Sequence, residues 1–386
     1  MRVAFYAPLK SPAHPVPSGD RRMARLLMQA LGVAGHDVRL ACRLRMWDSG
    51  ATPGRAERLA ALGRRCAAGL LRRWGRDDAG PDDPPWRPDV WFTYHLYHKA
   101  PDVIGPAVAA ALSIPYVAAE ASFAPKRASS GPFAAGHRLA EAAIRQAAAI
   151  VNLASQDAAG VLPLLDDPAR LVRLRPFLDT GPYVSAAAGR TSLRPALAHR
   201  FGLPLAEPWL VAVGMMRAGD KQASYAVLSR ALERLTDRPW RLLVVGDGAA
   251  LADVRADMDR RIGGRVRWAG ALGADDLAGV YACADLMVWP AVNEAYGMAL
   301  LEAQAAGCPV VAGRTGGVPD IVRDGVTGGL APVGDDAAFA AAVAVLLDDP
   351  VKRMECGRAA AAVTAAEHGI AEAARRLDAV LTEVTR

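Results

Sequence analysis

The pattern of apolar and polar positions along the chain predicts two successive series of alternating strands and helices. Short apolar runs are typical of buried strands, and the segments between them have helical periodicity. In the first series, strands are expected at residues 2–7, 37–42, 90–94, 116–119, 150–153 and 171–174, and helices at 21–32, 104–112, 133–149 and 157–165. In the second series, strands are expected at 209–213, 241–245, 266–269, 285–290 and 309–312, and two long helices at 351–362 and 367–384. This alternation predicts parallel sheets with helices on both faces.

A Pro- and Gly-rich stretch separates the two series. Between residues 179 and 208 the hydrophobic periodicity fades, so a break between domains is expected there. A chain of 386 residues is too long for one ordinary core and suits two domains. We therefore predict an α/β fold in which two Rossmann-like domains face each other across a cleft. The predicted boundaries are 1–180 for the N-terminal domain, 181–365 for the C-terminal domain and 366–386 for a last helix.

Composition narrows the class of protein. An apolar fraction of 52% favours globular domains with sizeable cores. The net charge of +6 attracts phosphorylated ligands or anionic surfaces but is no signature of nucleic-acid binding. The five cysteines are scattered without metal-ligand spacing, which is typical of reduced thiols in a cytosolic protein. The first residues indicate a strand rather than a signal peptide, and no apolar run reaches the roughly 18 residues of a membrane span.

The segment 43–87 differs from the rest of the first series. Its arginines surround leucines at helical spacing, and an acidic, Pro-rich turn follows at 77–85. The arginines are Arg64, Arg65, Arg72, Arg73 and Arg76. A basic amphipathic helix of this kind either lies on an anionic membrane, lines an acceptor groove or is an ordinary surface helix. The expected location is therefore the cytoplasm, with peripheral binding at the inner membrane face left open.

Two carboxylates frame the segment that is most informative about chemistry. A loop carrying Glu294 is expected to turn at Gly297 into a short helix that carries Glu302. Eight helical steps span roughly 12 Å, about the distance between the sugar and the ribose of a nucleotide-diphosphate sugar. Gly316 and Gly317 follow the next strand, where glycine lets backbone N–H groups approach an anion.

The stretch from Pro290 through both carboxylates to Gly-Gly-Val-Pro-Asp at 316–320 resembles the donor-binding signature of family 4 glycosyltransferases, which are retaining enzymes of the GT-B fold. The resemblance implies transfer of a sugar from a nucleotide-diphosphate sugar to a hydroxyl acceptor, without a cofactor or a metal. A glycan or lipid-linked glycan, as in polysaccharide biosynthesis, is the expected acceptor. The resemblance also implies that the last helix crosses back to the first domain.

The resemblance assigns roles to individual residues of the second domain. Glu302 is expected to bind the ribose hydroxyls, and Glu294 to hold the transferred sugar and stabilise charge at its anomeric carbon. Lys221 and Arg217 are expected to neutralise the departing diphosphate. In the family an Arg follows the Gly directly, whereas here two residues separate Arg217 from Gly214. The remaining expected donor contacts are Gly19, Gly214, Asp247, Tyr296, Gly297, Gly316 and Gly317.

Three residues of the first domain are expected to contact the acceptor or the sugar. His95 and His98 follow the strand 90–94, at the end where an open parallel sheet binds ligands, although a His at a strand end more often has a structural role. Glu120 stands where many family members carry a His, and the sequence does not decide whether it takes over that role. Gly19 belongs to a Ser-Gly-Asp turn that is also an ordinary helix start.

Two further functions stay open. A nucleotide-sugar 2-epimerase shares the fold and needs no separate acceptor. A non-catalytic subunit that binds a nucleotide sugar would fit the shifted Arg217 and the replacement at Glu120. A nicotinamide dehydrogenase is disfavoured, because no Gly-x-Gly-x-x-Gly follows the first strand.

Overall fold

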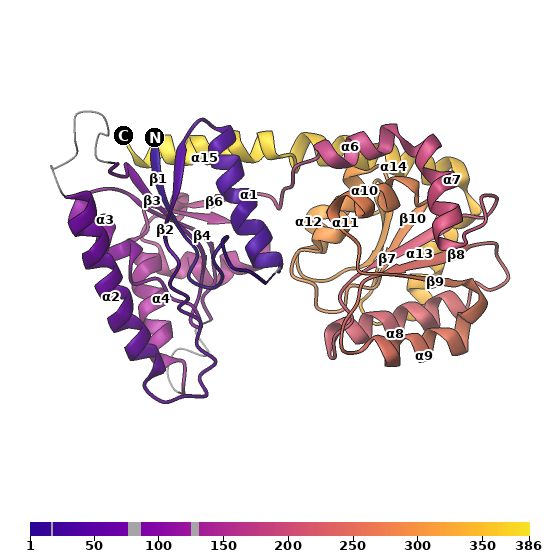
Figure 1. Ribbon diagram of the computed structural model, residues 1–386, viewed down its shortest axis with the longest axis horizontal. Coiled ribbons are helices and arrows are strands. Elements are labelled where there is room, and N and C mark those ends of the chain that lie inside the picture. Colours follow the sequence, from indigo (N-terminus) through magenta and orange to yellow (C-terminus); the bar gives the residue numbers. More distant parts are fainter. Residues whose placement is uncertain (17, 76–85, 125–130) are drawn as a thin grey trace. The chain divides into compact units, whose positions relative to one another are not determined.

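A computed structural model describes residues 1–16, 18–75, 86–124 and 131–386. The chain forms two compact units (Figure 1): unit 1 is Met1–Arg175 with Ile370–Arg386, and unit 2 is Pro176–Gly369. Each unit has one six-stranded sheet whose paired strands are parallel. The predicted α/β fold class is thereby confirmed. The acidic, Pro-rich turn predicted at 77–85 and Arg76 lie outside the described residues.

The sheet of unit 1 has the strand order β2-β1-β3-β4-β5-β6. Its strands are β1 (Arg2–Tyr6), β2 (Asp37–Cys42), β3 (Val90–Leu96), β4 (Tyr116–Ala121), β5 (Ala149–Asn152) and β6 (Leu171–Arg173). The apolar runs predicted these strands because β1, β3, β4 and β5 are buried along most of their length. The chain changes direction across the sheet between β1 and β3, which is where open parallel sheets bind ligands beyond the carboxyl ends of the strands.

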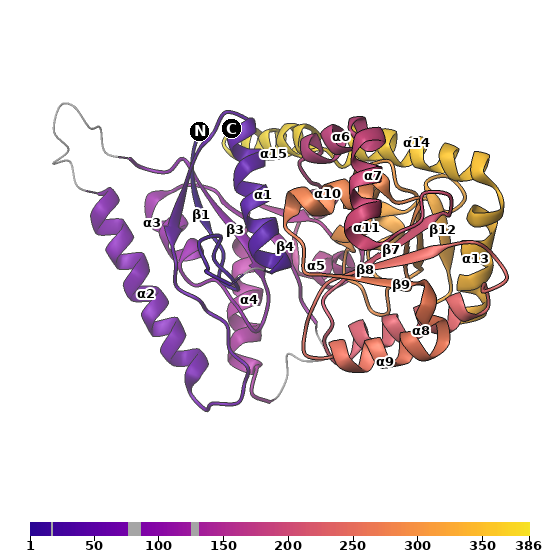
Figure 2. The same cartoon turned by 45° about the vertical axis from the view of Figure 1, so that its right-hand side comes forward.

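Six α-helices are described in unit 1. They are α1 (Gly19–Val33), α2 (Arg55–Trp74), α3 (Gly105–Leu112), α4 (Ala134–Gln146), α5 (Ala158–Val161) and α15 (Ile370–Val384). The side chain of Ser18 caps α1 by accepting a hydrogen bond from the backbone N–H of Arg21. Helix α15, drawn in yellow in Figures 1 and 2, packs against α1, although α15 follows unit 2 in the sequence.

The sheet of unit 2 has the order β12-β11-β10-β7-β8-β9, with the change of direction between β7 and β10. Its strands are β7 (Trp209–Val213), β8 (Arg241–Val245), β9 (Val266–Gly270), β10 (Leu286–Trp289), β11 (Val310–Gly313) and β12 (Gly328–Ala331). The apolar pattern did not predict β12. It is a Gly-rich edge strand, and a Cβ atom on Gly328 would stand 1.8 Å from the carbonyl oxygen of Val310.

The helices of unit 2 cover both faces of its sheet, with α8 and α9 on one face and α10 and α11 on the other (Figures 1 and 2). They are α6 (Gly181–Ala188), α7 (Arg190–Phe201), α8 (Asp220–Glu233), α9 (Leu251–Ile262), α10 (Ala274–Cys283), α11 (Met298–Ala305), α12 (Val318–Ile321), α13 (Asp336–Asp348) and α14 (Pro350–Glu367). Within the described ranges, no helix has both the length and the apolar content that crossing a bilayer requires.

Helices α6 and α7 occupy the stretch 179–208, where the sequence indicated only a fading of periodicity. Both helices pack against α10. Neither carries a broad apolar stripe: Tyr183, Leu197 and Ala198 are their buried residues. Arginines of α7 instead bind the start of β10, so long-range ion pairs hold this segment, and such pairs leave no periodic signal in the sequence.

Candidate functional site

Apart from Gly19, which lies in unit 1, the donor residues predicted from the sequence follow the carboxyl ends of the strands of unit 2. Lys221 lies in the first turn of α8, after β7, and Glu294 lies in the loop between β10 and α11. The Lys221 ammonium forms an ion pair with Oε2 of Glu294 and stands 5.2 Å from the ring centre of Trp289. The indole N–H of Trp289 donates to the same carboxylate oxygen over 3.2 Å. The side chains of Lys221 and Glu294 are 19% and 18% exposed, so a ligand can reach both groups.

The loop that carries Glu294 is fixed to α8 by polar contacts. The side-chain amide of Asn293 donates to Asp220 (2.8 Å), and the backbone N–H of Val292 donates to the hydroxyl of Ser224 (3.0 Å). Asn293 and Ala291 both have positive φ angles, 54° and 53°. Such angles cost free energy in residues with a Cβ atom and persist where the surroundings impose them. Asp220 and Ser224 were not predicted as site residues, since a polar residue in a first helical turn is an ordinary feature of sequences.

Gly316 and Gly317 lie directly against this loop. A Cβ atom on Gly316 (φ +48°) would stand 2.0 Å from the carbonyl oxygen of Glu294, and one on Gly317 would stand 2.4 Å from that of Ala295. The N–H of Gly317 donates to the carbonyl of Ala295 over 2.8 Å. The following helix, α12, has only four residues. The two glycines therefore position the Glu294 loop by close backbone contact; their contact with the donor stays a prediction.

The turn at Gly297 and the helix that carries Glu302 are confirmed. Gly297 has a φ of 72°, in the left-handed region, and α11 begins at the next residue. Glu302 lies within α11 and is only 3% exposed, while Tyr296 is half-buried. Burial of a carboxylate is costly unless polar groups surround it, so polar partners have to offset the desolvation of Glu302.

The loops after β7 and β8 are joined by backbone contacts. The N–H of Met216 donates to the carbonyl of Asp247 (2.9 Å), and a Cβ atom on Gly246 would stand 2.0 Å from the carbonyl oxygen of Gly214. The Asp247 carboxylate accepts from the N–H of Gly248, which is a contact within its own turn. The side chain of Arg217 is exposed and takes no part in the Lys221–Glu294 pair.

In unit 1, His95 and Glu120 meet Asp20 at the carboxyl ends of β3 and β4. Nδ1 of His95 is 3.1 Å from an Asp20 oxygen and 3.9 Å from a Glu120 oxygen. His95 and Glu120 both have positive φ angles, 64° and 55°. Burial acts to lower the pKa of His95, but the charges of Glu120 and Asp20 outweigh it and raise that pKa above its ordinary value. The hydrogen bond with His95 lowers the pKa of Asp20.

His98 and Gly19 have different surroundings from His95. His98 is buried and stacks on His137, with ring centres 4.4 Å apart, and the edge of Phe133 completes this aromatic cluster. Gly19 begins α1 with no atom within 4 Å of where its Cβ would lie, so packing does not explain the glycine. Gly19 was the predicted donor contact of this turn, whereas the neighbouring Asp20 is the residue that binds His95.

The two six-stranded parallel sheets correspond to the GT-B fold. The structure is similar over its whole length to a glycosyltransferase from Rickettsia africae (TM-score 0.75, 14% identity, 100% of this chain and 98% of that one). It is also similar to Alr3699/HepE of Anabaena in complex with UDP (TM-score 0.72, 17% identity, 99% and 100%).

Residues 207–349 match the model of the family described as glycosyl transferases group 1. The curated relatives include D-inositol 3-phosphate glycosyltransferases of Corynebacterium diphtheriae (35% identity over 46% of this chain and 43% of that protein) and Thermobispora bispora (36% over 52% and 49%). The matched part thus spans about half the length of these relatives. The family match thus lies within unit 2, whereas the two similar structures cover both units.

Proposed function

We propose that the chain transfers a sugar, with retention of configuration, from a nucleotide-diphosphate sugar to a hydroxyl acceptor. The observation that carries this proposal is the ion pair between Lys221, in the first turn of α8, and Glu294, in the loop that leads to the helix carrying Glu302. Alr3699/HepE is a fold neighbour that has been solved with UDP and with UDP-glucose, which supports a nucleotide-sugar donor.

In the proposed reaction each charged group has one task. Glu302 binds the ribose diol, because a carboxylate accepts two hydrogen bonds at once. The diphosphate displaces Glu294 from Lys221, and the ammonium stabilises the charge that develops on the leaving phosphate. Glu294 is then available to the hydroxyls of the sugar. The bond from the anomeric carbon to the phosphate breaks as the acceptor oxygen attacks from the same face, and the acceptor proton passes to the leaving phosphate oxygen.

Donor binding tests the proposal first. Thermal unfolding is followed with UDP, GDP, ADP and dTDP and their common sugars, in the presence of EDTA. A ligand at 100 times its dissociation constant adds roughly 2.7 kcal/mol of stability. Glu302→Ala is expected to abolish the shift, and Glu294→Ala to retain it while losing turnover. The proposal fails if both variants keep full activity, and metal independence fails if EDTA abolishes activity.

The products of the reaction separate the alternatives. A nucleotide-sugar 2-epimerase would convert the donor without any acceptor, which NMR of the donor sugar would detect. A binding subunit would show the thermal shift but neither transfer nor hydrolysis. The curated relatives are named for D-inositol 3-phosphate, so inositol phosphates belong in the acceptor panel beside glycans and lipid-linked glycans.

We further propose that α2 binds the chain peripherally to an anionic membrane that presents a lipid-linked acceptor. Helix α2 carries six exposed arginines and one glutamate, and its apolar face is turned inward. The arginines are Arg55, Arg58, Arg64, Arg65, Arg72 and Arg73. Each basic residue near such a surface contributes about 1 kcal/mol. The wild-type protein is expected to sediment with phosphatidylglycerol vesicles. A variant in which four of these arginines are changed to glutamine is expected to stay in the supernatant. Equal binding to neutral vesicles would contradict the proposal.

A further inference from the structure

A groove of about 490 Å³ lies in unit 2 at the amino ends of the strands, which is the opposite edge of the sheet from Lys221 and Glu294. Asp285 and Pro309, which directly precede β10 and β11, form its floor, and the first turns of α14 form one wall. Ligand pockets for small molecules have volumes of roughly 300–1,000 Å³. We call it the amino-edge groove.

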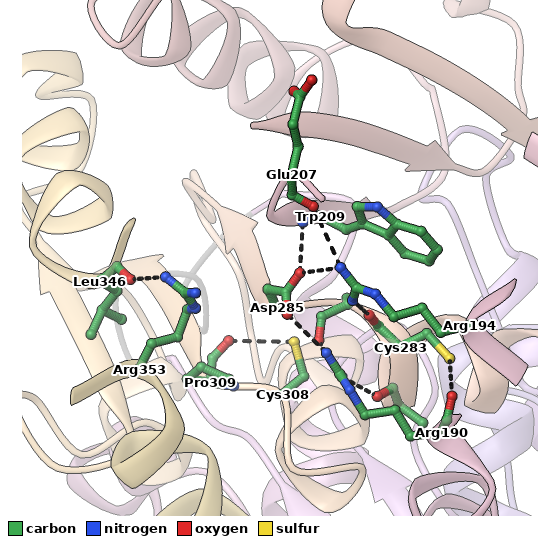
Figure 3. A network of polar contacts seen from close by, with 12 residues as sticks. Arg190, Arg194, Glu207, Trp209, Cys283, Asp285, Cys308, Pro309, Leu346 and Arg353 are labelled. Atoms are coloured by element: carbon green, nitrogen blue, oxygen red, sulfur yellow. Dashed lines mark hydrogen bonds and ion pairs between the residues drawn. The ribbon is translucent and has the colours of Figure 1, made fainter. Parts of the chain in front are cut away.

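The floor of the amino-edge groove has its negative charge already neutralised (Figure 3). The Asp285 carboxylate binds Arg190 over 2.8 Å and Arg194 over 2.9 Å, and it also accepts the backbone N–H of Trp209 over 2.8 Å. Arg190 lines the groove as well and donates to two backbone carbonyls beside Asp285. These contacts hold α7 against β10. Asp285 therefore does not repel an anion from the groove.

The wall formed by α14 carries two arginines whose charges are not paired with a carboxylate in the described part of the chain. Nη1 of Arg353 donates to the carbonyls of Leu346 (2.6 Å) and Leu347 (3.1 Å), which fixes the guanidinium in place (Figure 3). Nη2 of Arg358 donates to the sulfur of Met354 over 3.4 Å. Among the residues that the structure describes, neither arginine forms an ion pair with a carboxylate, whereas most arginines of unit 2 do. The groove therefore has a net positive charge.

We propose that the amino-edge groove binds a small phosphorylated ligand. The phosphate would contact Arg353 and Arg358, since the guanidinium fork matches phosphate oxygens and is more weakly hydrated than an ammonium. The rest of the ligand would lie on the apolar surface that Ala306, Pro309 and Met354 give to the groove. Met354 is 50% exposed although it is a large apolar residue, so covering it contributes to binding.

The groove adjoins the end of the helix that carries Glu302, so a ligand in the groove would affect the donor site. This step rests on the proposed function. Ala306 and Gly307 follow directly on α11, the helix that carries Glu302. A Cβ atom on Gly357 of α14 would stand 2.4 Å from the carbonyl oxygen of Gly307, so α14 and the end of α11 touch without intervening side chains. A ligand held between Arg353 and Ala306 would therefore contact the end of α11, the helix whose Glu302 is proposed to bind the ribose.

Methionine methyl NMR tests the binding site directly. Protein with ¹³C-methyl methionine is titrated with phenyl phosphate at constant ionic strength, and the Met354 signal is assigned with Met354→Leu. We expect a saturable shift of that signal with phenyl phosphate and none with phenol. In Arg353→Gln/Arg358→Gln the affinity should fall at least about tenfold, because two charge-assisted contacts are removed. A matched control, Arg375→Gln/Arg376→Gln on α15, should leave the affinity unchanged.

The proposal is wrong if phenyl phosphate leaves Met354 unshifted, or if the α14 variant and the α15 control bind it equally well. Failure of the donor proposal has a different signature. Met215 is 57% exposed and follows Gly214 in the loop near Lys221, so nucleotide binding is reported by Met215 and groove binding by Met354. Either signal can respond without the other.

Discussion

The ion pair between Lys221 and Glu294 permits a double-mutant cycle on the uncomplexed protein. The perturbations are Lys221→Met, Glu294→Gln and the double variant, which remove the charges and keep most of the side-chain volume. At a separation of about 4 Å and an effective dielectric constant of about 20, two unit charges attract by about 4 kcal/mol. Both side chains are about four-fifths buried, so desolvation offsets part of that attraction. We expect a coupling free energy of about 2 kcal/mol, within the range of residues in direct contact.

The free energy of unfolding is measured by urea denaturation, with tryptophan fluorescence as the probe, because Trp289 contacts both charges. The control is the exposed pair of Arg145 and Glu141 on α4, for which the same cycle should give no more than about 0.5 kcal/mol. A coupling for Lys221 and Glu294 as small as that of the control would refute the reasoning. It would mean that the two groups do not hold each other before the donor binds.

Three further predictions concern residues that stabilise the structure within unit 1 or within unit 2. Asp285→Asn should destabilise unit 2 by about 3 kcal/mol in urea unfolding, because two partly buried arginines lose their partner; a loss below about 1 kcal/mol would contradict this. Gly316→Ala should lower the melting temperature and weaken nucleotide binding, because the new Cβ would meet a carbonyl oxygen at 2.0 Å, whereas Gly273→Ala, with no atom within 4 Å, should do neither. The Asp20–His95 pair should contribute stability below about pH 6.5 and lose it as the pH rises through the raised pKa of His95. The stability difference between wild type and His95→Gln should therefore shrink as the pH rises above about 6.5, and a ¹H NMR titration of His95 should give a pKa above the ordinary value.

The strands of the sheet interiors could be predicted closely because burial on both faces makes them continuous apolar runs. The predicted strands 209–213 and 241–245 agree with β7 and β8 to the residue. Edge strand β12 could not be found in this way, since two of its four residues are glycines. The helices in 181–201 were missed for a related reason: their attachment depends on Arg190 and Arg194, whose partner Asp285 lies more than 90 residues away.

The candidate site was predictable where a motif is local. Glu294, Gly297 and Glu302 belong to one short segment, and their loop–turn–helix arrangement follows from the glycine and the apolar run. Lys221, the ion-pair partner of Glu294, is 73 residues away in the sequence. Only the family resemblance therefore connected these two residues in the sequence. Asp20 was overlooked because an acidic residue in a first helical turn usually serves the helix dipole. Only the structure shows that it also binds His95.

The glycines of unit 2 limit which positions near Glu294 can be substituted. In the sequence, Gly316 and Gly317 indicate an anion cradle, but their Cβ positions are taken by carbonyl oxygens of the Glu294 loop. Gly246 is constrained in the same way by the loop after β7. Close backbone contacts with Gly316 and Gly317 therefore help to set the place of the loop, and Lys221 and Trp289 hold the Glu294 carboxylate itself. We therefore expect any side chain at Gly316 to displace the loop that carries Glu294, whereas a substitution at Met215, which is 57% exposed, should leave that loop in place.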